Sequence, residues 1–227
     1  PTSTVSAGAT PTFTPTIGPS PTPTPTPTVG PTPTPTPPSV SMISSVEFPK
    51  WSPDGSKMIF SASSTDYSGK HIWVLDFDGS NLTRLTDPSE FDGESARHPD
   101  WSGDNKIVFS VKDLDIWTMN ADGSGKSETG IRVAAALIAG SVNPRTYNPV
   151  WSPDGSQIAF YGKGIGGGSH VWVAGPGWSN LTQISNSIDG FDWANYPSWS
   201  SDGTKICFSV RTGNNSSSPK TQIYMAN

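Results

Sequence analysis

The chain has 227 residues and a formal net charge of −5, with 19 acidic and 14 basic side chains. A net negative charge disfavours sequence-independent binding to nucleic-acid phosphates, so we expect no nucleic-acid partner. The longest apolar stretch, Val133 to Ala139, is too short to cross a bilayer, and the single cysteine, Cys207, excludes an internal disulfide and a zinc pattern.

Residues 1–40 have the composition of a stalk. They contain 13 Pro and 13 Thr, and the first charged residue of the chain is Glu47. Proline at every second position removes half of the backbone donors and fixes φ, which is incompatible with helices and central strands. We therefore expect a disordered Pro/Thr-rich linker that acts as a semi-rigid polyproline II spacer, or else a short tail without a spacing role.

The rest of the chain, residues 41–227, carries an internal repeat. Its clearest part is a Trp-Ser pair followed by turn residues, as in Trp-Ser-Pro-Asp-Gly. The four copies are residues 48–55, 98–104, 148–155 and 196–203, and their tryptophans, Trp51, Trp101, Trp151 and Trp199, stand 50, 50 and 48 residues apart. Self-similarity at such a period indicates a repeat architecture.

Each motif is followed by short β-branched and aromatic stretches that predict strands. The second strand is expected at 57–60, 106–109, 157–160 and 205–208, and the third at 71–73, 115–117, 170–172 and 222–224. A fourth, Asn-Leu-Thr strand follows at 81–83 and 180–182, whereas we expect the second repeat to lack this strand and to have a longer connection at 124–144 instead. Seven of the nine tryptophans occupy equivalent positions, so we expect them to pack one sheet against the next.

The recurring pattern x-Pro-x-Trp-Ser-Pro-Asp-Gly, Ile-x-Phe, Ile-Trp and Leu-Thr resembles the WD-like repeat of TolB-type β-propellers. The resemblance implies an all-β propeller of four-stranded antiparallel blades, here at about 46–87, 96–139, 146–185 and 194–227. Such propellers usually have six or more blades. The fourth repeat reaches Asn227 before its last strand. Either Val40–Val46 supplies this outer strand and closes a four-bladed ring, or the chain is a fragment of a larger propeller.

The resemblance also implies that the turns lie on one face, opposite the loops between second and third strands. Those loops, at 61–70, 111–113, 161–169 and 210–221, differ in sequence, as expected of binding loops on a rigid scaffold. The residues that begin the first strands should lie on the same face as these loops and border a central channel. The candidate ligand-binding residues are therefore Arg97, His98, Tyr147, Asn148, Phe191, Trp193, Asn195 and Tyr196.

Aromatic rings beside carboxylates and amides suit a peptide or sugar ligand, which they would bind by stacking and hydrogen bonding. The alternative for Phe191 and Trp193 is that they only cover the end of the domain. Cys207 stands where other repeats have Ile59, Val108 or Ala159, so we expect it to be a small core residue.

Catalytic and metal-binding patterns are weak. His71 and His170 stand where other repeats have Asp115 and Gln222, which indicates a polar strand position. His98 has no evident nucleophile partner, and there is no Gly-x-Ser-x-Gly motif. We expect no catalytic residue, no metal and no cofactor.

Three functions remain open. The first is a non-enzymatic propeller of the periplasm or cell surface that recognises a protein, peptide or glycan, a location that the uncharged stalk favours. The second is the propeller of a prolyl-oligopeptidase-type peptidase whose catalytic domain lies outside this chain, which would be attached covalently to it. The third is a propeller lyase or hydrolase that uses Arg97 and His98.

Overall fold

The structure is a computed structural model that describes residues 43–131, 145–163, 168–178, 180–185, 191–212 and 220–226. The predicted Pro/Thr stalk, residues 1–40, lies outside these ranges and stays a prediction.

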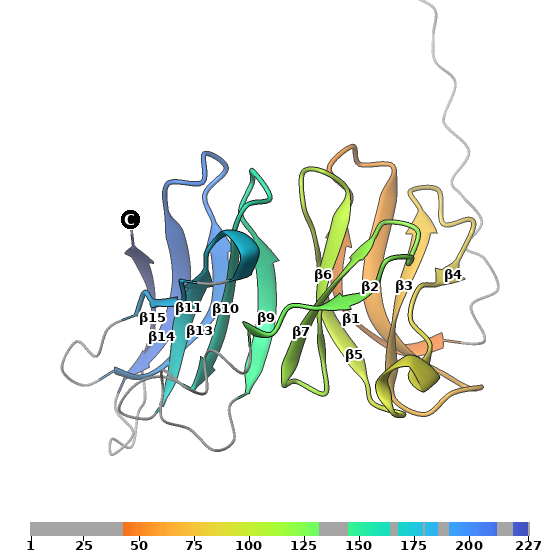
Figure 1. Ribbon diagram of the computed structural model, residues 1–227, viewed down its shortest axis with the longest axis horizontal. Coiled ribbons are helices and arrows are strands. Elements are labelled where there is room, and N and C mark those ends of the chain that lie inside the picture. Colours follow the sequence, from red (N-terminus) through yellow and green to blue (C-terminus); the bar gives the residue numbers. More distant parts are fainter. Residues whose placement is uncertain are drawn as a thin grey trace, which may run out of the picture. The chain divides into compact units, whose positions relative to one another are not determined.

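The described residues form four successive antiparallel units, which we call repeats 1 to 4 (Figure 1). Within each repeat, strands that follow one another in the chain pair side by side. Repeat 1 contains β1 (Ile43–Trp51), β2 (Lys57–Ser64), β3 (Lys70–Asp76) and β4 (Thr83–Arg84). Repeat 2 contains β5 (Ala96–Trp101), β6 (Lys106–Val111), β7 (Asp115–Asn120) and β8 (Ser127–Glu128). Repeat 3 contains β9 (Thr146–Trp151), β10 (Ile158–Lys163), β11 (Ser169–Ala174) and β12 (Thr182–Gln183), and repeat 4 contains β13 (Phe191–Trp199), β14 (Ile206–Thr212) and β15 (Lys220–Ala226).

Repeats 1 and 2 are separate four-stranded sheets. Repeats 3 and 4 are joined by one parallel pairing, Ser169 with Trp193, so that their strands count as a single sheet. Two short 3-10 helices, η1 (Pro88–Phe91) and η2 (Pro176–Trp178), lie in the connections. The predicted all-β architecture of antiparallel strands is therefore confirmed for the described residues.

The turn after each repeat tryptophan is held by the same local hydrogen bonds. A serine hydroxyl donates to the aspartate two residues later, at 2.5 to 2.6 Å, and accepts from a backbone amide at or just before the start of the second strand, at 2.8 to 3.0 Å. The four serines are Ser52, Ser102, Ser152 and Ser200. Because these bonds favour the charged carboxylate, the serine hydroxyls lower the pKa of Asp54 and of Asp202 to about 2.

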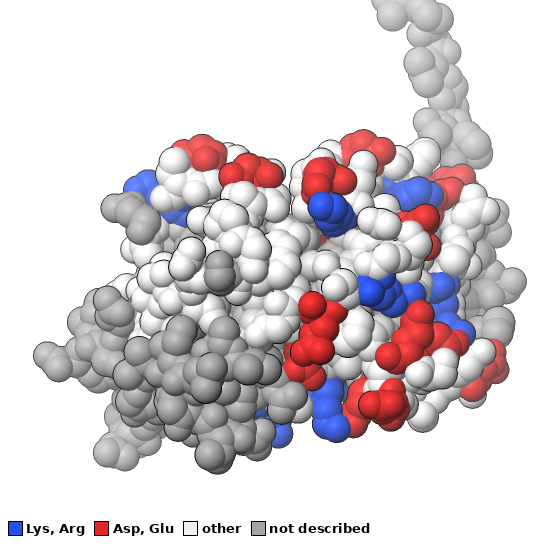
Figure 2. All heavy atoms as spheres, in the orientation of Figure 1, with Lys and Arg blue, Asp and Glu red and all other residues white. Residues whose placement is uncertain are grey.

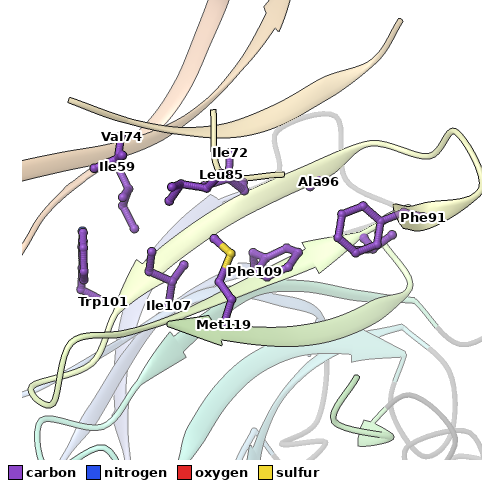
Figure 3. Packing of buried hydrophobic residues seen from close by; sticks show 11 residues of the cluster. Ile59, Ile72, Val74, Leu85, Phe91, Ala96, Trp101, Ile107, Phe109 and Met119 are labelled. Atoms are coloured by element: carbon purple, nitrogen blue, oxygen red, sulfur yellow. The ribbon is translucent and has the colours of Figure 1, made fainter. Parts of the chain in front are cut away.

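Three hydrophobic clusters lie between successive repeats. In the first, Ile59, Ile72 and Val74 of repeat 1 pack against Trp101 and other side chains of repeat 2 (Figure 3). Equivalent residues pack repeat 2 on repeat 3 and repeat 3 on repeat 4. The repeat tryptophans therefore join sheet to sheet at most positions, as predicted: Trp101, Trp117, Trp151, Trp172 and Trp199 belong to these clusters or pack against them.

The fourth strand of repeat 2 corrects the sequence analysis. Although the Leu-Thr sequence is missing there, β8 forms and pairs with β7, Ser127 opposite Thr118 and Glu128 opposite Trp117. The register is the same as between β3 and β4. Pairing at this edge is made by the main chain, so it does not require particular side chains.

The two ends of the repeat array give further corrections. Trp51 is 55% exposed and Cys207 is exposed, although both were expected in the core. Residues Ile43–Val46 belong to β1, and Ile43 and Ser44 pair with β2 rather than with the last repeat. These side chains stay uncovered because among the described residues no further sheet packs on the outer faces of repeats 1 and 4.

Figure 2 shows acidic and basic side chains intermixed over the region of β1 to β8 on the face in view. On the described part of this face, no broad surface of one sign is visible. Within the described ranges, no helix is long and apolar enough to cross a membrane.

Candidate functional site

Each first strand contains a β-bulge just before its repeat tryptophan. The register between first and second strands shifts at this point in all four repeats. The residue three positions before the tryptophan has a left-handed backbone: Phe48 (φ 55°), His98 (φ 54°), Asn148 (φ 49°) and Tyr196 (φ 55°). Bulges redirect side chains, and non-glycine residues in this conformation are strained. Because all four repeats have such a residue at the same position, the fold constrains the backbone along this edge of the repeats.

The hydroxyl of a second-strand serine closes three of these bulges. Its partner is the carbonyl of the residue before the strained one: Ser61 donates to Glu47 (3.3 Å), Ser110 to Arg97 (3.1 Å) and Ser209 to Asn195 (3.1 Å). Repeat 3 has Tyr161 at the equivalent position of its second strand. The repeat is broken here, and a large ring replaces a small hydroxyl.

Tyr161 joins a line of aromatic rings that runs from bulge to bulge. Its ring stacks on Tyr147, with centroids 5.1 Å apart, and meets Tyr196 edge-on at 5.5 Å. Tyr147 in turn lies 6.4 Å from the ring of His98, which packs against Phe48 at 4.2 Å. The four first strands therefore present a continuous aromatic edge.

A cavity of about 480 Å³ opens at this edge between repeats 3 and 4, and we call it the aromatic pocket. Trp193 and Tyr196, which border it, are 45% and 57% exposed. A Cβ atom at Gly162 would come within 2.4 Å of the Arg145 carbonyl oxygen, so only glycine fits there. The lining residues are Arg145, Tyr147, Tyr161, Gly162, Gly168, Ser169, Trp193, Asn195 and Tyr196.

The polar groups of the aromatic pocket include several hydrogen-bond donors. The Arg145 guanidinium donates to the Tyr147 hydroxyl at 3.0 Å, and the Ser169 hydroxyl donates to Asn195 Oδ1 at 2.8 Å. Burial raises the pKa of the Tyr161 hydroxyl, which therefore stays protonated at neutral pH. Among the described lining residues, Arg145 is the one charged group, and none is a carboxylate. The site can stack on rings and donate hydrogen bonds to ligand oxygen atoms.

His98 lies in a buried polar cluster in repeat 2. Its Nδ1 atom is 2.9 Å from the Ser110 hydroxyl and 3.7 Å from Asp113 Oδ1, while Arg97 lies 3.8 Å from the other oxygen of Asp113. Burial lowers the pKa of His98 to about 4, although Asp113 opposes the shift, so the ring is neutral at pH 7.

This cluster does not have the geometry of a hydrolytic triad. In a triad the serine meets one ring nitrogen and the carboxylate the other, whereas here both approach Nδ1. Ser110 is also fully buried and donates to the Arg97 carbonyl, so no substrate could reach its hydroxyl.

The other two histidines are buried in strands. His71 is fully buried, with Nε2 3.2 Å from the Ser68 carbonyl, and His170 is 3% exposed, with Nδ1 2.7 Å from the Ser185 carbonyl. Within the described residues, no three His, Cys, Asp or Glu side chains are placed to hold a metal ion.

The eight predicted site residues separate into groups. Four of them line the aromatic pocket: Tyr147, Trp193, Asn195 and Tyr196. Arg97 and His98 lie instead in the cluster around Asp113. Asn148 is half-buried, and its Oδ1 atom has no hydrogen-bond partner among the described residues. The backbone of Phe191 begins β13, and its side chain lies outside what the structure describes.

Three residues of the pocket were not among the predicted site residues: Arg145, Tyr161 and Ser169. Tyr161 and Ser169 are the ends of the predicted loop 161–169, so the region was found but not the side chains. A signal was present for Tyr161, because the other repeats have serine at its position. Arg145 precedes β9 and had no repeat signal.

No family model matches the chain, and no curated protein matches it in sequence. Solved structures are similar to it in fold. TolB from Acinetobacter baumannii has a TM-score of 0.57 at 18% identity over 79% of this chain, which spans about 40% of that protein. A putative TolB from Agrobacterium tumefaciens has a TM-score of 0.56 at 16% identity, covering 80% of this chain and 76% of that one.

A chain of a nidogen/laminin complex is also similar, with a TM-score of 0.54 at 12% identity, covering 78% of this chain and 64% of that one. At such identities the likeness concerns the fold alone. The described repeats therefore have the fold of a TolB-like β-propeller.

Proposed function

We propose that this chain is a non-enzymatic recognition module, a propeller of four blades that binds a protein, peptide or glycan in the aromatic pocket. The observation that carries the proposal is that the pocket forms where the repeat breaks. Tyr161 replaces a serine that closes the bulge in each of the other repeats, and its ring contacts the rings of Tyr147 and Tyr196.

The exposed rings support binding rather than packing. A large aromatic side chain gains stability by being buried, yet Trp193 and Tyr196 leave about half of their surface in water beside a cavity. Rings in such a position gain contact area when a peptide side chain or a sugar ring covers them. Arg145, Ser169 and Asn195 add polar groups that would orient the ligand.

The polar lining favours a ligand rich in acceptor oxygens. Peptide carbonyls, carboxylates and sugar hydroxyls all accept hydrogen bonds, and the described lining offers donors and no carboxylate that would repel an acidic group. We place the protein in the periplasm or on the cell surface, where a Pro/Thr stalk would hold the propeller away from its attachment point.

Substituting Tyr161 tests the proposal. Fluorescently labelled protein would be screened against a displayed random-peptide library and a glycan array, and bound sequences or sugars would be titrated by fluorescence anisotropy. Tyr161→Ser restores the residue of the other repeats and should weaken binding at least tenfold, since one aromatic contact of a hot spot contributes about 1–2 kcal/mol or more. Trp193→Ala should have a similar effect.

Phe48→Asn is the matched control. It removes a bulge aromatic outside the pocket and installs the residue that repeat 3 has at the same strained position. Binding should be unchanged in this variant. Equal affinities for wild type, Tyr161→Ser and Trp193→Ala would refute the proposed site.

A further inference from the structure

The turn between the third and fourth strands breaks the repeat a second time. It has the same length in repeats 1 to 3, as their equivalent strand pairs show: Val74 with Thr83, Thr118 with Ser127 and Val173 with Thr182. In the middle of this turn, repeats 1 and 2 have an Asp-Gly pair, whereas repeat 3 has Gly177 and Trp178. Trp178 is also, with Trp193, one of the two tryptophans outside the seven equivalent positions. Repeat 3 has therefore exchanged turn-forming residues for a large ring.

Local turn chemistry does not explain this exchange. In repeats 1 and 2 the aspartate carboxylate accepts two hydrogen bonds from the serine two residues later, at 2.9 Å from its amide and 2.6 Å from its hydroxyl. Gly177 has no side chain to accept them. Trp178 takes the left-handed backbone (φ 61°) that Gly79 and Gly123 take without strain at the same position (φ 84° in both). A bulky residue is strained in this conformation, and strain of this kind points to a functional role of the side chain.

Core packing does not require the ring either. Trp178 is half-buried and meets Trp151 edge-on at the margin of the second hydrophobic cluster, with ring centroids 5.3 Å apart. In repeat 2, where Gly123 stands in place of Trp178, the equivalent Trp101 is 9% exposed, against 6% for Trp151. The turn of repeat 2 closes directly on repeat 1, because a Cβ atom at Gly123 would lie 3.1 Å from the Leu85 carbonyl oxygen. The ring of Trp178 is thus an addition that burial of the repeat tryptophan does not need.

A cavity of about 360 Å³ lies beside Trp178 between repeats 2 and 3, and we call it the indole pocket because Trp151 and Trp178 line it. Its volume lies in the range of about 300–1,000 Å³ that is usual for small-molecule sites. The indole pocket is separate from the aromatic pocket. β11 begins at Ser169, which lines the aromatic pocket, and ends at Ala174, just before the turn that carries Trp178.

The polar groups of the indole pocket suit a neutral sugar. Thr118, Asn120 and Ser156 line it with hydroxyl and amide groups, which both donate and accept hydrogen bonds, as sugar hydroxyls do. Among the described lining residues the one charged group is Lys106, and its ammonium is paired with Asp104 at 3.3 Å. The charge at the pocket is therefore balanced, so neither an acidic nor a basic ligand is favoured.

We propose that the indole pocket binds a neutral sugar ring, with its apolar C–H face stacked on the Trp178 indole and its hydroxyls bonded to Thr118, Asn120 and Ser156. A flat apolar ring beside groups that donate and accept matches the two kinds of surface that a sugar has. The proposal does not rest on the aromatic pocket, and either site can fail without the other.

Saturation-transfer NMR on the full chain tests the indole pocket with methyl α-glucoside, methyl β-galactoside, methyl α-mannoside and N-acetylglucosamine as probes. At least one of these sugars should receive saturation from wild type. Trp178→Gly restores the glycine of the other repeats and removes the backbone strain, so it should fold and should weaken binding of that sugar about tenfold or more. Trp178→Phe keeps a stacking ring and should lose less. Tyr161→Ser, the matched change in the aromatic pocket, should bind the sugar like wild type.

Saturation transfer to none of the four sugars would overturn the proposal, as would equal affinities of wild type and Trp178→Gly. A sugar signal lost in Tyr161→Ser and kept in Trp178→Gly would place the sugar in the aromatic pocket, which would overturn the indole pocket and support the proposed function. Circular dichroism should show Trp178→Gly folded like wild type, so that its loss of binding reports on the missing ring.

Discussion

After each repeat tryptophan the four repeats make the same contacts, whereas the side chain at the bulge just before it differs from repeat to repeat. The turns repeat one pattern of serine, aspartate and backbone amide. The bulges share a backbone conformation, yet the strained residue is Phe48, His98, Asn148 or Tyr196. The comparison indicates that the turns after the repeat tryptophans maintain the scaffold, whereas the side chains at the bulge ends can vary and form a binding site.

The contrast between scaffold and binding site is sharpest within one strand, β10. Phe160 is fully buried between repeats 2 and 3, and its neighbour Tyr161 lies in the aromatic pocket. Phe160→Ala should lower the free energy of unfolding by about 3–5 kcal/mol, because it leaves a cavity in the core. Tyr161→Ser should cost about 1 kcal/mol or less, since the hydroxyl can close the bulge as in the other repeats.

Denaturant unfolding followed by tryptophan fluorescence measures both variants. Equal losses for the two neighbours would show that Tyr161 is a core residue. That result would remove the distinction between scaffold and site on this strand.

The bulge of repeat 2 should make stability depend on pH, because His98 is the one strained residue of the four whose ordinary pKa lies near neutrality. Burial lowers its pKa to about 4 from 6.5 in the unfolded chain, while Asp113 and Glu47 oppose the shift and Arg97 adds to it. The unfolded chain therefore binds the proton first as pH falls. The His98 contribution is fully present above pH 6.5 and is lost progressively between pH 6.5 and 4, about 2 kcal/mol of it by pH 5.

The variant His98→Asn isolates this effect, since Asn tolerates the left-handed backbone and repeat 3 has Asn at this position. Unfolding free energies measured at pH 8 and pH 5 should differ by about 2 kcal/mol less in the variant than in wild type. His71, whose pKa burial also lowers, remains in both proteins and so cancels. An unchanged difference between the two pH values would contradict a neutral, buried His98.

The smallest expected effect concerns the turns. Ser152 is 4% exposed and its hydroxyl bonds both Asp154 and the Gln157 amide, so Ser152→Ala should cost about 1–2 kcal/mol. Ser156→Ala removes a hydroxyl bond to the same aspartate on the exposed side of the turn and should cost a few tenths of a kcal/mol. Denaturant unfolding of both variants checks the order, and a reversed order would mean that the repeated serine is not what holds the turn.

The four turns and most of the strands were predictable because their causes are local. Turn-forming residues such as Asp and Gly favour each turn, and the serine, aspartate and amide that close it lie within five residues of one another. Tyr147 and Asn195, two of the four predicted residues that line the pocket, came together for a related reason: they occupy equivalent positions, and a repeating backbone places equivalent positions along one edge.

The rest depended on contacts between residues distant in sequence. Tyr161 belongs to the pocket because its ring meets Tyr147 and Tyr196, and His98 is excluded from the pocket because it packs on Phe48 and Asp113. A one-dimensional pattern does not record which of several rings at equivalent positions will share a cavity.

By itself, the sequence determined the repeat, its turns, its strand order and the stacking positions of the tryptophans, because turn chemistry and alternating burial are encoded within each copy. Only the tertiary structure decided which copies of those positions are covered. Cys207 and Trp51 have core positions in the repeat and yet are exposed, since burial requires a neighbouring sheet as well as a suitable residue.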